Sequence, residues 1–366
     1  MKINILLPYK EKFDEKKASS VSITIKNNLM YTKFLSGIKV YGQNVKNPLF
    51  KNNFVGINYS VFSLKSKNIF LSHQMLKMIS KDNSHKQLIE IHNRPYLINH
   101  IVKCIDSPVS LFFHNDPLSM KGSKSIRERK NILKKCAAIF CVSKYIKKQF
   151  MKGINTEEQK VHVLHNGVDR KIKNFPEKKK EVLFVGRLVS EKGVDLYVEV
   201  AKSIASYYPD WNFGIIGSFR LGDENSTNSF GNKIISKFKG IGPQAKYYGF
   251  KEYNFVEEKM KTAAIIVIPS IWQEPFGLVA AEAMSNGICI IASKVGGIPE
   301  IVENNGVLIE NINFQKLEKN LIQLINDKEL RSFYQQKAWK NFKFSAEISA
   351  KKLDNFRQII FNQKVN

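Results

Sequence analysis

Two carboxylates stand eight residues apart in SIWQEPFGLVAAEAMSNG, residues 270–287, and their surroundings differ. Glu274 directly precedes a Pro-Phe-Gly sequence that predicts a turn, whereas Glu282 lies in a run of small apolar residues. A solvated helix face is the ordinary explanation of a charge in a helix. The flanking alanines weaken that explanation for Glu282, because burying an unpaired carboxylate is costly. A carboxylate at this position therefore needs a partner.

The segment between the two acids predicts an anion site. If the Pro-Phe-Gly turn starts a helix, the amide groups of Phe276, Gly277 and Leu278 lack helical acceptors and face whatever lies there. The positive end of the helix favours an anion at that place. Glu274 then stands at the edge of the site, and Glu282 can accept hydrogen bonds from ribose hydroxyls. The chemistry indicated is a sugar ring at one acid, a nucleoside at the other, and phosphates between them.

A second group of charges follows a predicted strand in FVGRLVSEKG, residues 184–193. Gly186 and Arg187 end the strand, and Lys192 stands just before a predicted helix. Arginine offers a planar fork of donors and lysine a point charge, which together suit a diphosphate. The same residue types are also ordinary on a protein surface, so this segment is not specific by itself.

Other nucleotide and metal signatures are missing from the sequence. No GxGxxG follows the first predicted strand, and GSFRLGDEN, with glycines at Walker spacing, carries Asp223 where a P-loop needs lysine. The four cysteines match neither a CxxC redox pair nor the ligand spacing of a zinc site. These observations argue against a dehydrogenase and a P-loop ATPase.

Short apolar runs alternate with helical stretches along the whole chain. The first half contains INILLP, GIKVYG, QLIEIHN, PVSLFFHN, AAIFCVS and KVHVLHN. The second half contains VLFVGRL, WNFGIIGS, AKYYGF, AAIIVIPS, GICIIAS and GVLIE. Continuous apolar runs are typical of strands buried on both faces, so the sequence predicts an α/β protein with two doubly wound, Rossmann-like parallel-sheet domains. We expect the domains to face each other across a cleft, with ligands beyond the carboxyl ends of the strands.

The length of 366 residues also favours two domains. We expect an N-terminal domain at 1–172 and a C-terminal domain at 182–342. The stretch between them, 173–181, is polar and charged and contains a proline, which predicts a linker. The last segment, 343–366, predicts an amphipathic helix that crosses back to the first domain.

Positive charge is concentrated in the first half of the chain. The formal net charge is +26, of which residues 1–180 carry +23 and residues 181–366 carry +3. This asymmetry indicates an anionic partner of the first half, either nucleic acid or a membrane surface with acidic lipid or phosphorylated glycan. A lysine-rich compositional bias is the alternative explanation. The apolar runs are too short for a membrane span or a signal peptide, so a cytoplasmic protein is expected.

Taken together, the motifs resemble those of a known family. Over almost its whole length the sequence is similar to the retaining, two-domain GT-B glycosyltransferases of group 1, or family 4. The segments that carry this resemblance are the acidic pair in E-x7-E spacing, GRLVSEKG, HNGVD at 165–169, VSKYIKKQF from residue 142 and VGGIPEIV from residue 295. HNRP and HNDP, in the first half, are similar to the subset that builds lipopolysaccharide core or related surface glycans.

The resemblance implies donor-binding roles for residues of the second half. Gly186, Arg187 and Lys192 would hold the nucleotide diphosphate and neutralise charge on the leaving group. Phe250 and Lys251, which close the YYGFK strand, would meet the base.

The same resemblance assigns the acidic pair and the turn between them. Glu282 would bind the ribose, and Glu274 would approach the donor sugar's hydroxyls as a catalytic residue. The amide groups of Phe276, Gly277 and Leu278 would complete the phosphate cradle.

In the first half, the resemblance implies a catalytic His114, which follows a strand and would face the reacting sugar. His92, Asn93 and Arg94 would contact the acceptor or the sugar. Ser20 stands where many members have a Gly-Gly pair beside the diphosphate, and it could still offer an amide and a hydroxyl.

The function implied is the transfer of a hexose or N-acetylhexosamine from a nucleotide-diphosphate sugar, with UDP favoured, to a hydroxyl of a lipopolysaccharide core or other surface glycan. No metal or cofactor is implied, because cationic side chains and helix amides would do the work of a divalent ion. The basic first half would contact the anionic inner face of the cell membrane. Two other functions stay open: a UDP-sugar epimerase of the same fold, and a nucleic-acid-binding protein that is motivated by charge alone.

Overall fold

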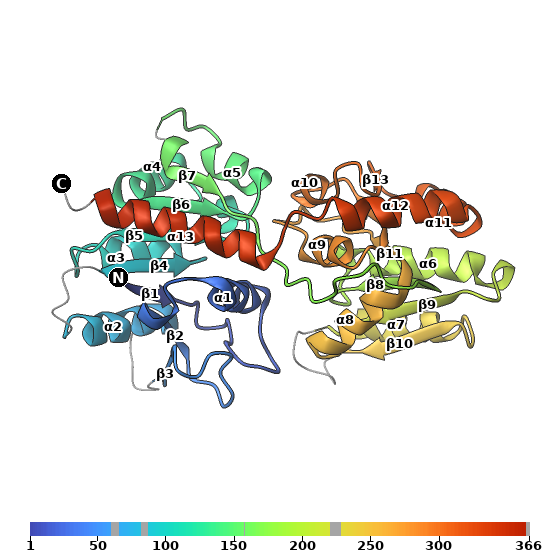
Figure 1. The fold of residues 1–366 in the computed structure, drawn as a ribbon, viewed down its shortest axis with the longest axis horizontal. Coiled ribbons are helices and arrows are strands. Elements are labelled where there is room, and N and C mark those ends of the chain that lie inside the picture. The colour runs from blue at the N-terminus through green and yellow to red at the C-terminus, as the bar shows by residue number, and fades with distance from the viewer. Residues whose placement is uncertain (60–65, 82–86, 157, 220–227, 364–366) are drawn as a thin grey trace. The chain divides into compact units, whose positions relative to one another are not determined.

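The chain divides into two structural units. Unit 1 comprises Met1–Asp169 and Phe344–Asn366, and unit 2 comprises Arg170–Lys343 (Figure 1). The computed structural model describes residues 1–59, 66–81, 87–156, 158–219 and 228–363. Asp223, on which the sequence argument against a P-loop depends, lies outside the described residues. The expected linker at 173–181 is wrong at its end, because residues 179–181 already belong to a strand that pairs on both sides.

Unit 1 contains a seven-stranded, all-parallel sheet in the order β3-β2-β1-β4-β5-β6-β7. Its strands are β1 (Lys2–Leu6), β2 (Ile38–Gln43), β3 (Phe54–Ile57), β4 (Gln87–His92), β5 (Val109–Phe113), β6 (Ala138–Cys141) and β7 (Val161–Val163). Every residue of β4, β5 and β6 is buried, which explains the mainly apolar sequences of β5 and β6. Strand β4 also buries three polar side chains, those of Gln87, Glu90 and His92. The sequence prediction missed only the edge strand β3 of this sheet.

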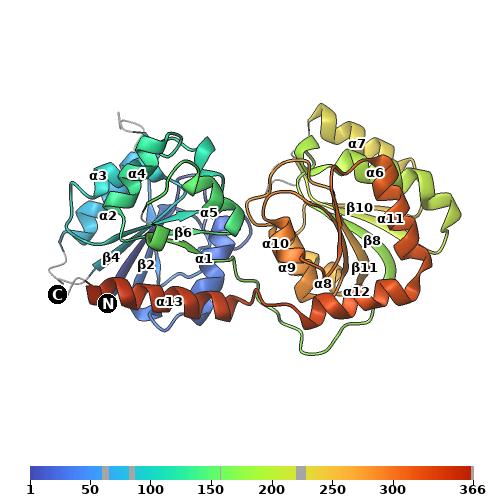
Figure 2. The ribbon, with the colours of Figure 1, turned by 90° about the horizontal axis from the view of Figure 1, so that it is seen from above.

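Helices pack on the sheet of unit 1, and the last helix of the chain is one of them (Figure 2). They are α1 (Ser20–Tyr31), α2 (Lys67–Ile79), α3 (Ile98–Ile101), α4 (Ile126–Lys135), α5 (Lys144–Met151) and α13 (Ala346–Gln363). Helix α13 runs beside α1, and its Leu353 and Ile360 join the same apolar core as Val21 and Ile25. About 25 cal/mol is gained per Å² of apolar surface buried, so this contact anchors the C-terminal segment to unit 1.

Unit 2 contains a six-stranded, all-parallel sheet in the order β10-β9-β8-β11-β12-β13. Its strands are β8 (Lys179–Val185), β9 (Asn212–Ile216), β10 (Ala245–Gly249), β11 (Ala263–Ile268), β12 (Cys289–Ser293) and β13 (Val307–Ile309). Its helices are α6 (Val194–Ile204), α7 (Ser229–Lys239), α8 (Tyr253–Thr262), α9 (Leu278–Ser285), α10 (Ile298–Val302), α11 (Phe314–Asn326) and α12 (Lys328–Lys340). All six strands lie where the apolar runs predict them.

The two sheets share one topological feature that positions a site. In each sheet the strand order reverses once, between β1 and β4 in unit 1 and between β8 and β11 in unit 2. Ligands of doubly wound sheets bind beyond the carboxyl ends of the strands at such a point. The prediction of two doubly wound, Rossmann-like domains is therefore confirmed. In the described part of the chain, no helix is both long and apolar enough to cross a membrane.

Candidate functional site

The turn at Glu274–Gly277 is held by the loop that precedes α10. The amide of Gly297 donates to the carbonyl oxygen of Glu274 at 2.7 Å, and the amide of Gly296 donates to Gln273 Oε1 at 2.8 Å. Gly296 has a φ of 56°, and a Cβ there would lie 2.1 Å from the Glu274 carbonyl oxygen. A residue without a Cβ is needed for this approach. The VGG sequence thus shapes the turn from which α9 starts.

Helix α9 begins where the sequence predicts a helix start. Gly277 is its N-cap with a φ of 96°, and the side chain of Phe276 is buried. The first amides of the helix, from Leu278 onward, have no acceptor inside the helix, and the positive end of the helix dipole lies at the same place. This end of α9 is able to bind an anion.

Lys192 and Glu274 form an ion pair, although they are 82 residues apart in the sequence. The same carboxylate oxygen, Glu274 Oε1, accepts a 2.7 Å hydrogen bond from Ser270 Oγ. The other oxygen, Oε2, has no hydrogen-bond partner among the residues that the structure describes. Glu274 is 8% exposed, so this oxygen is an open acceptor in a largely dry setting. Lys192 keeps two further N–H donors for a ligand.

Arg187 lies at the end of β8, next to the strand that leads to Glu274. Its side chain is 42% exposed, and the guanidinium Nη2 stands 3.9 Å from Glu191 Oε2. An exposed pair at this distance contributes little, so it does not hold the guanidinium away from an anion. Gly186 precedes Arg187 and lies so close to Gly217 of the neighbouring strand end that a Cβ on Gly217 would be 1.8 Å from the Gly186 carbonyl oxygen.

Glu282 lies in the second turn of α9 and is half-buried. Burial, and to a lesser degree the charge of Glu257, raises the pKa of Glu282 to about 8. The carboxyl group has no hydrogen-bond or ion-pair partner among the described residues, although its backbone carbonyl accepts from Asn286 Nδ2 at 2.9 Å. The carboxyl is therefore left for a ligand that can donate hydrogen bonds to it, as a ribose can.

Phe250 and Lys251 directly follow β10, the edge strand of the sheet in unit 2. The Lys251 ammonium lies 5.5 Å from the ring centroid of Phe255. Strands β9 and β8 separate β10 from β11, so this pair lies at the carboxyl edge of the same sheet but toward its far end. No described contact joins it to Glu274.

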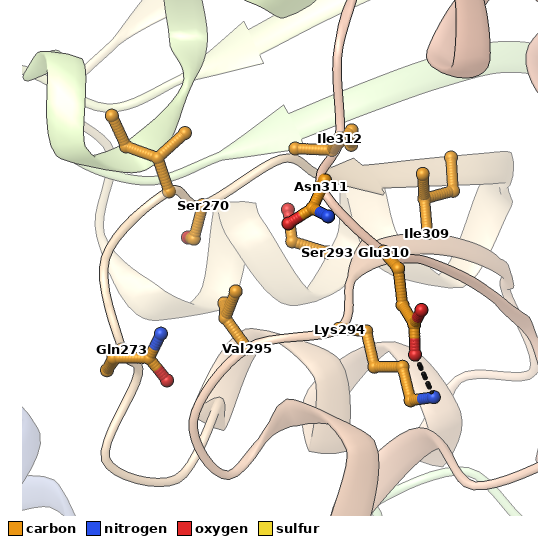
Figure 3. Close-up of a pocket in the computed structure, with 10 residues that line it drawn as sticks. Ser270, Gln273, Ser293, Lys294, Val295, Ile309, Glu310, Asn311 and Ile312 are labelled. Atoms are coloured by element: carbon orange, nitrogen blue, oxygen red, sulfur yellow. Dashed lines mark hydrogen bonds and ion pairs between the residues drawn. The ribbon is translucent and has the colours of Figure 1, made fainter.

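A pocket of about 480 Å³ opens beside the Glu274 turn, at the carboxyl ends of β11, β12 and β13 (Figure 3). Its lining consists of Ser270, Ile271, Gln273, Ser293, Lys294, Val295, Ile309, Glu310, Asn311 and Ile312. Lys294 and Glu310 form an ion pair on one side of it (Figure 3). None of these residues was predicted as a site residue, although Val295 and residues 270–273 belong to segments that the sequence analysis singled out. They follow their strands without any distinctive spacing, so the sequence carries no signal for them.

In unit 1, His92 and His114 are in direct contact. His92 is the last residue of β4, and His114 follows the adjacent strand β5. Their Nδ1 and Nε2 atoms, respectively, are 2.8 Å apart. His92 is 4% exposed, whereas His114 is half-buried. Burial lowers the pKa of His114 to about 4 and the pKa of His92 well below its ordinary value, so both rings are neutral near pH 7.

Asn93 and Arg94 surround this pair, and Ser20 lies elsewhere in unit 1. Asn93 is 2% exposed, adopts a φ of 53°, and accepts the amide of His114 at 2.8 Å through Oδ1. Arg94 donates from its guanidinium to the carbonyl oxygen of Asn93 at 2.6 Å. Ser20 is the first residue of α1 and is exposed. The structure thus brings three of the predicted residues of unit 1 together with His114.

Sequence reasoning missed a narrow polar slot beside the histidine pair. It has a volume of about 10 Å³, and its polar lining residues are Thr24, Asn28, His92, His114, His165, Asn166 and Ser349. Asn28 Oδ1 and His92 Nε2 are buried without a hydrogen-bond partner among the described residues. These groups come from α1, from the ends of three strands or the loops after them, and from α13. No sequence pattern links such distant positions.

Two family models match the chain in succession. The model described as Glycosyltransferase Family 4 matches residues 38–171, and the model described as Glycosyl transferases group 1 matches residues 166–341. The chain belongs to the group 1 and family 4 glycosyltransferases. The donor-binding residues that were assigned to the second half of this glycosyltransferase all lie within residues 166–341, the range of the second model.

Individual proteins with similar sequences are also named as glycosyltransferases. An uncharacterized glycosyltransferase of Methanocaldococcus jannaschii is 35% identical over 197 residues, which are 53% of this chain and 51% of the relative. A second glycosyltransferase of that organism is 27% identical over 60% of each chain. The chain thus spans between half and three fifths of these curated relatives.

Solved structures of other proteins have a similar fold. HepE from Anabaena, in complex with UDP, has a TM-score of 0.75 at 17% identity, with 98% of this chain and 100% of the other covered. WaaG, a glycosyltransferase involved in lipopolysaccharide biosynthesis, has a TM-score of 0.68 at 15% identity, with 98% and 99% covered. The fold of this glycosyltransferase is therefore GT-B.

Proposed function

We propose that this glycosyltransferase transfers a hexose or N-acetylhexosamine from a UDP-sugar to a hydroxyl group, with retention of the anomeric configuration. The observation that carries the proposal is the meeting of Lys192, Glu274 and the first turn of α9 at the β8/β11 reversal point. A cation and free helix amides suit a diphosphate, and a carboxylate with one open oxygen suits sugar hydroxyls. The complex of HepE with UDP supports uridine as the base.

In the proposed reaction, the bond between the anomeric carbon and the oxygen of the β-phosphate breaks. Lys192, Arg187 and the amides at Gly277 and Leu278 neutralise the charge that develops on the leaving diphosphate. That diphosphate takes the proton of the acceptor hydroxyl on the same face of the sugar, where the new glycosidic bond forms. His114 contacts the reacting sugar. These cationic and amide groups make a metal unnecessary.

The acceptor that we propose is a lipopolysaccharide core or another surface glycan, met at the inner face of the cell membrane. WaaG, which shares the fold, is involved in lipopolysaccharide biosynthesis. Most of the positive charge lies in residues 1–180. Each Lys or Arg near an anionic lipid surface contributes about 1 kcal/mol, so a basic unit 1 favours peripheral binding.

A panel of nucleotide sugars in thermal-shift measurements tests the donor. UDP-sugars should raise the melting temperature of the wild type, and Glu282→Gln should abolish most of that shift. Glu258→Gln is the matched control, because Glu258 is an exposed glutamate on the neighbouring helix α8 and should leave the shift unchanged. The absence of a shift with every nucleotide would contradict the proposal.

Product analysis then separates transfer from its rivals. Release of UDP together with a glycosylated acceptor supports a transferase. Conversion of the UDP-sugar to a free epimer without acceptor would instead identify an epimerase. Binding to vesicles with phosphatidylglycerol, and not to duplex DNA of equal phosphate concentration, supports the membrane contact over nucleic acid.

A further inference from the structure

His92 and His114 are joined by one hydrogen bond between their rings, and one proton serves it. Each neutral imidazole carries one N–H, and 2.8 Å between Nδ1 of His92 and Nε2 of His114 requires that one of them donates to the other. Which nitrogen of a histidine carries the proton is set by the hydrogen bond that the other nitrogen makes. The contact therefore also determines what His114 offers at its remaining nitrogen, Nδ1.

His92 is fixed from several sides. Its ring stacks on Phe112 of β5, with centroids 4.4 Å apart and an angle of 12° between the planes. Glu90, which lies two residues before His92 in β4, accepts two 2.8 Å hydrogen bonds from Arg357 of α13. Arg357 also binds Asp354, and all three charged residues are at most 3% exposed. These contacts fix the position and orientation of the His92 ring.

The surroundings of His92 indicate where its proton lies. Its second nitrogen, Nε2, is buried and has no hydrogen-bond partner among the residues described. A buried N–H without a partner is rarer than a buried acceptor without one. The missing partner at Nε2 therefore favours a His92 proton on Nδ1, donated to His114 Nε2.

We propose that His92 is a positioning residue that holds His114 as the tautomer protonated on Nδ1, so that His114 presents an N–H donor to a sugar hydroxyl oxygen. The role of His114 at the sugar rests on the proposed function. The tautomer is a property of the free protein and does not depend on it. Burial keeps both rings neutral, which supports a fixed tautomer, because a protonated His114 would carry a donor on each nitrogen.

Nuclear magnetic resonance of protein with ¹⁵N-labelled histidine tests the tautomer directly. Long-range ¹H–¹⁵N spectra distinguish a protonated from an unprotonated ring nitrogen, and His114→Ala assigns the His114 signals among the seven histidines. We expect His114 to have the shifts of a single tautomer with the proton on Nδ1. A proton on Nε2, or rapid averaging of both tautomers in the wild type, would overturn the proposal.

Two substitutions of His92 form a matched pair. The amide of Asn reaches the position of the imidazole Nδ1, whereas the amide of Gln reaches the position of Nε2. His92→Asn should keep the His114 tautomer and retain more of the UDP release from UDP-glucose or UDP-N-acetylglucosamine than His92→Gln. His92→Gln should allow both tautomers and lower kcat by about 10- to 100-fold, the usual loss for a group that orients another.

Further measurements separate positioning from folding and from the proposed function. The affinity of both variants for UDP should equal that of the wild type, because, apart from Ser20, the groups assigned to the diphosphate and ribose lie in unit 2. Equal kcat and equal tautomer in His92→Gln and His92→Asn would refute the positioning role. If the wild type has the expected tautomer but releases no UDP, the effect of His92 on the His114 tautomer would be supported and the proposed transferase function would be refuted.

Discussion

Replacing Glu282 by Gln should stabilise the free protein at alkaline pH and weaken nucleotide binding at the same time. The reason is that Glu282 is half-buried on α9 with no partner for its carboxyl group among the described residues. Burial raises the pKa of Glu282 from the ordinary 4.5 to about 8. An uncharged amide of nearly the same shape avoids the cost of ionising in that place, but it accepts fewer hydrogen bonds from a ribose.

The magnitude follows from the pKa, and its sign from linkage. Below pH 4.5 the carboxyl is protonated in both the folded and the unfolded chain, so the substitution has little effect there. Between pH 4.5 and 8 the unfolded chain ionises first, and the wild type loses stability as pH rises. The full difference corresponds to at most about 5 kcal/mol. Because Glu282 keeps some contact with solvent, we expect about 1–3 kcal/mol at pH 8.5.

Thermal unfolding of both proteins between pH 5 and 8.5 measures this effect. For a domain of the size of unit 2, each kcal/mol raises the melting temperature by about 2–4 °C. The gain of Glu282→Gln should grow with pH, while titration calorimetry shows weaker binding of UDP. The exposed control Glu258→Gln should change neither quantity. A gain that is the same at pH 5 and pH 8.5, or unchanged affinity for UDP, would refute the reasoning.

Three further predictions concern Lys192, Arg357 and Lys178. Lys192→Met should lower the affinity for UDP by about 10- to 100-fold, since a charged hydrogen bond contributes about 1.5–3 kcal/mol, and should leave the affinity for uridine unchanged. Arg357→Met should destabilise unit 1 by about 3–5 kcal/mol, because it leaves Glu90 as an uncompensated buried charge, and Glu90→Gln in the same chain should recover part of the loss. Lys178→Met should cost about 1–3 kcal/mol and also weaken UDP binding, because the Lys178 ammonium joins carbonyl oxygens at the ends of α8 and α9.

Isothermal titration and thermal unfolding provide the controls for these predictions. Lys202→Met, at an exposed lysine of α6, should not change UDP affinity. Equal losses for UDP and uridine in Lys192→Met would mean that Lys192 does not meet the phosphates. A double variant of Arg357 and Glu90 that is as unstable as the sum of the two single variants would show that the charges act independently.

Strands buried on both faces were the most predictable part of the fold. All six strands of unit 2 were predicted. The central strands β11 and β12 are buried throughout, and burial there demands apolar residues without long interruption. Strand β3 was missed because it pairs on one side only, spans four residues and contains a glycine, so its sequence lacks that run. The last residues of the expected linker were assigned wrongly because they are charged and yet belong to a strand. Residues 179–181 are two lysines and a glutamate, yet they extend β8.

The candidate site was predictable as a set of residues but not as a set of contacts. Glu274 and Glu282 were conspicuous because acids in an apolar run need an explanation. The ion pair of Lys192 with Glu274 depends on β8 lying next to β11, which no local pattern states. The same holds for the contact of His92 with His114, which needs β4 beside β5. Strand order is decided by packing of the whole sheet, so pairings across it require the structure.

The two units differ in the kind of chemistry that their side chains can perform. In unit 1 His92 is buried and His114 half-buried, and the lowered pKa of each ring leaves both neutral near pH 7, so the pair offers hydrogen bonds but no charge. In unit 2 an ammonium, a guanidinium and the start of α9 supply positive charge at one strand reversal. Departure of a diphosphate needs positive charge, whereas a sugar hydroxyl is oriented well by a neutral donor. In the proposed transfer, the burial that lowers the pKa of His114 thus keeps it from becoming a second cation, so stabilisation of the leaving group falls to unit 2.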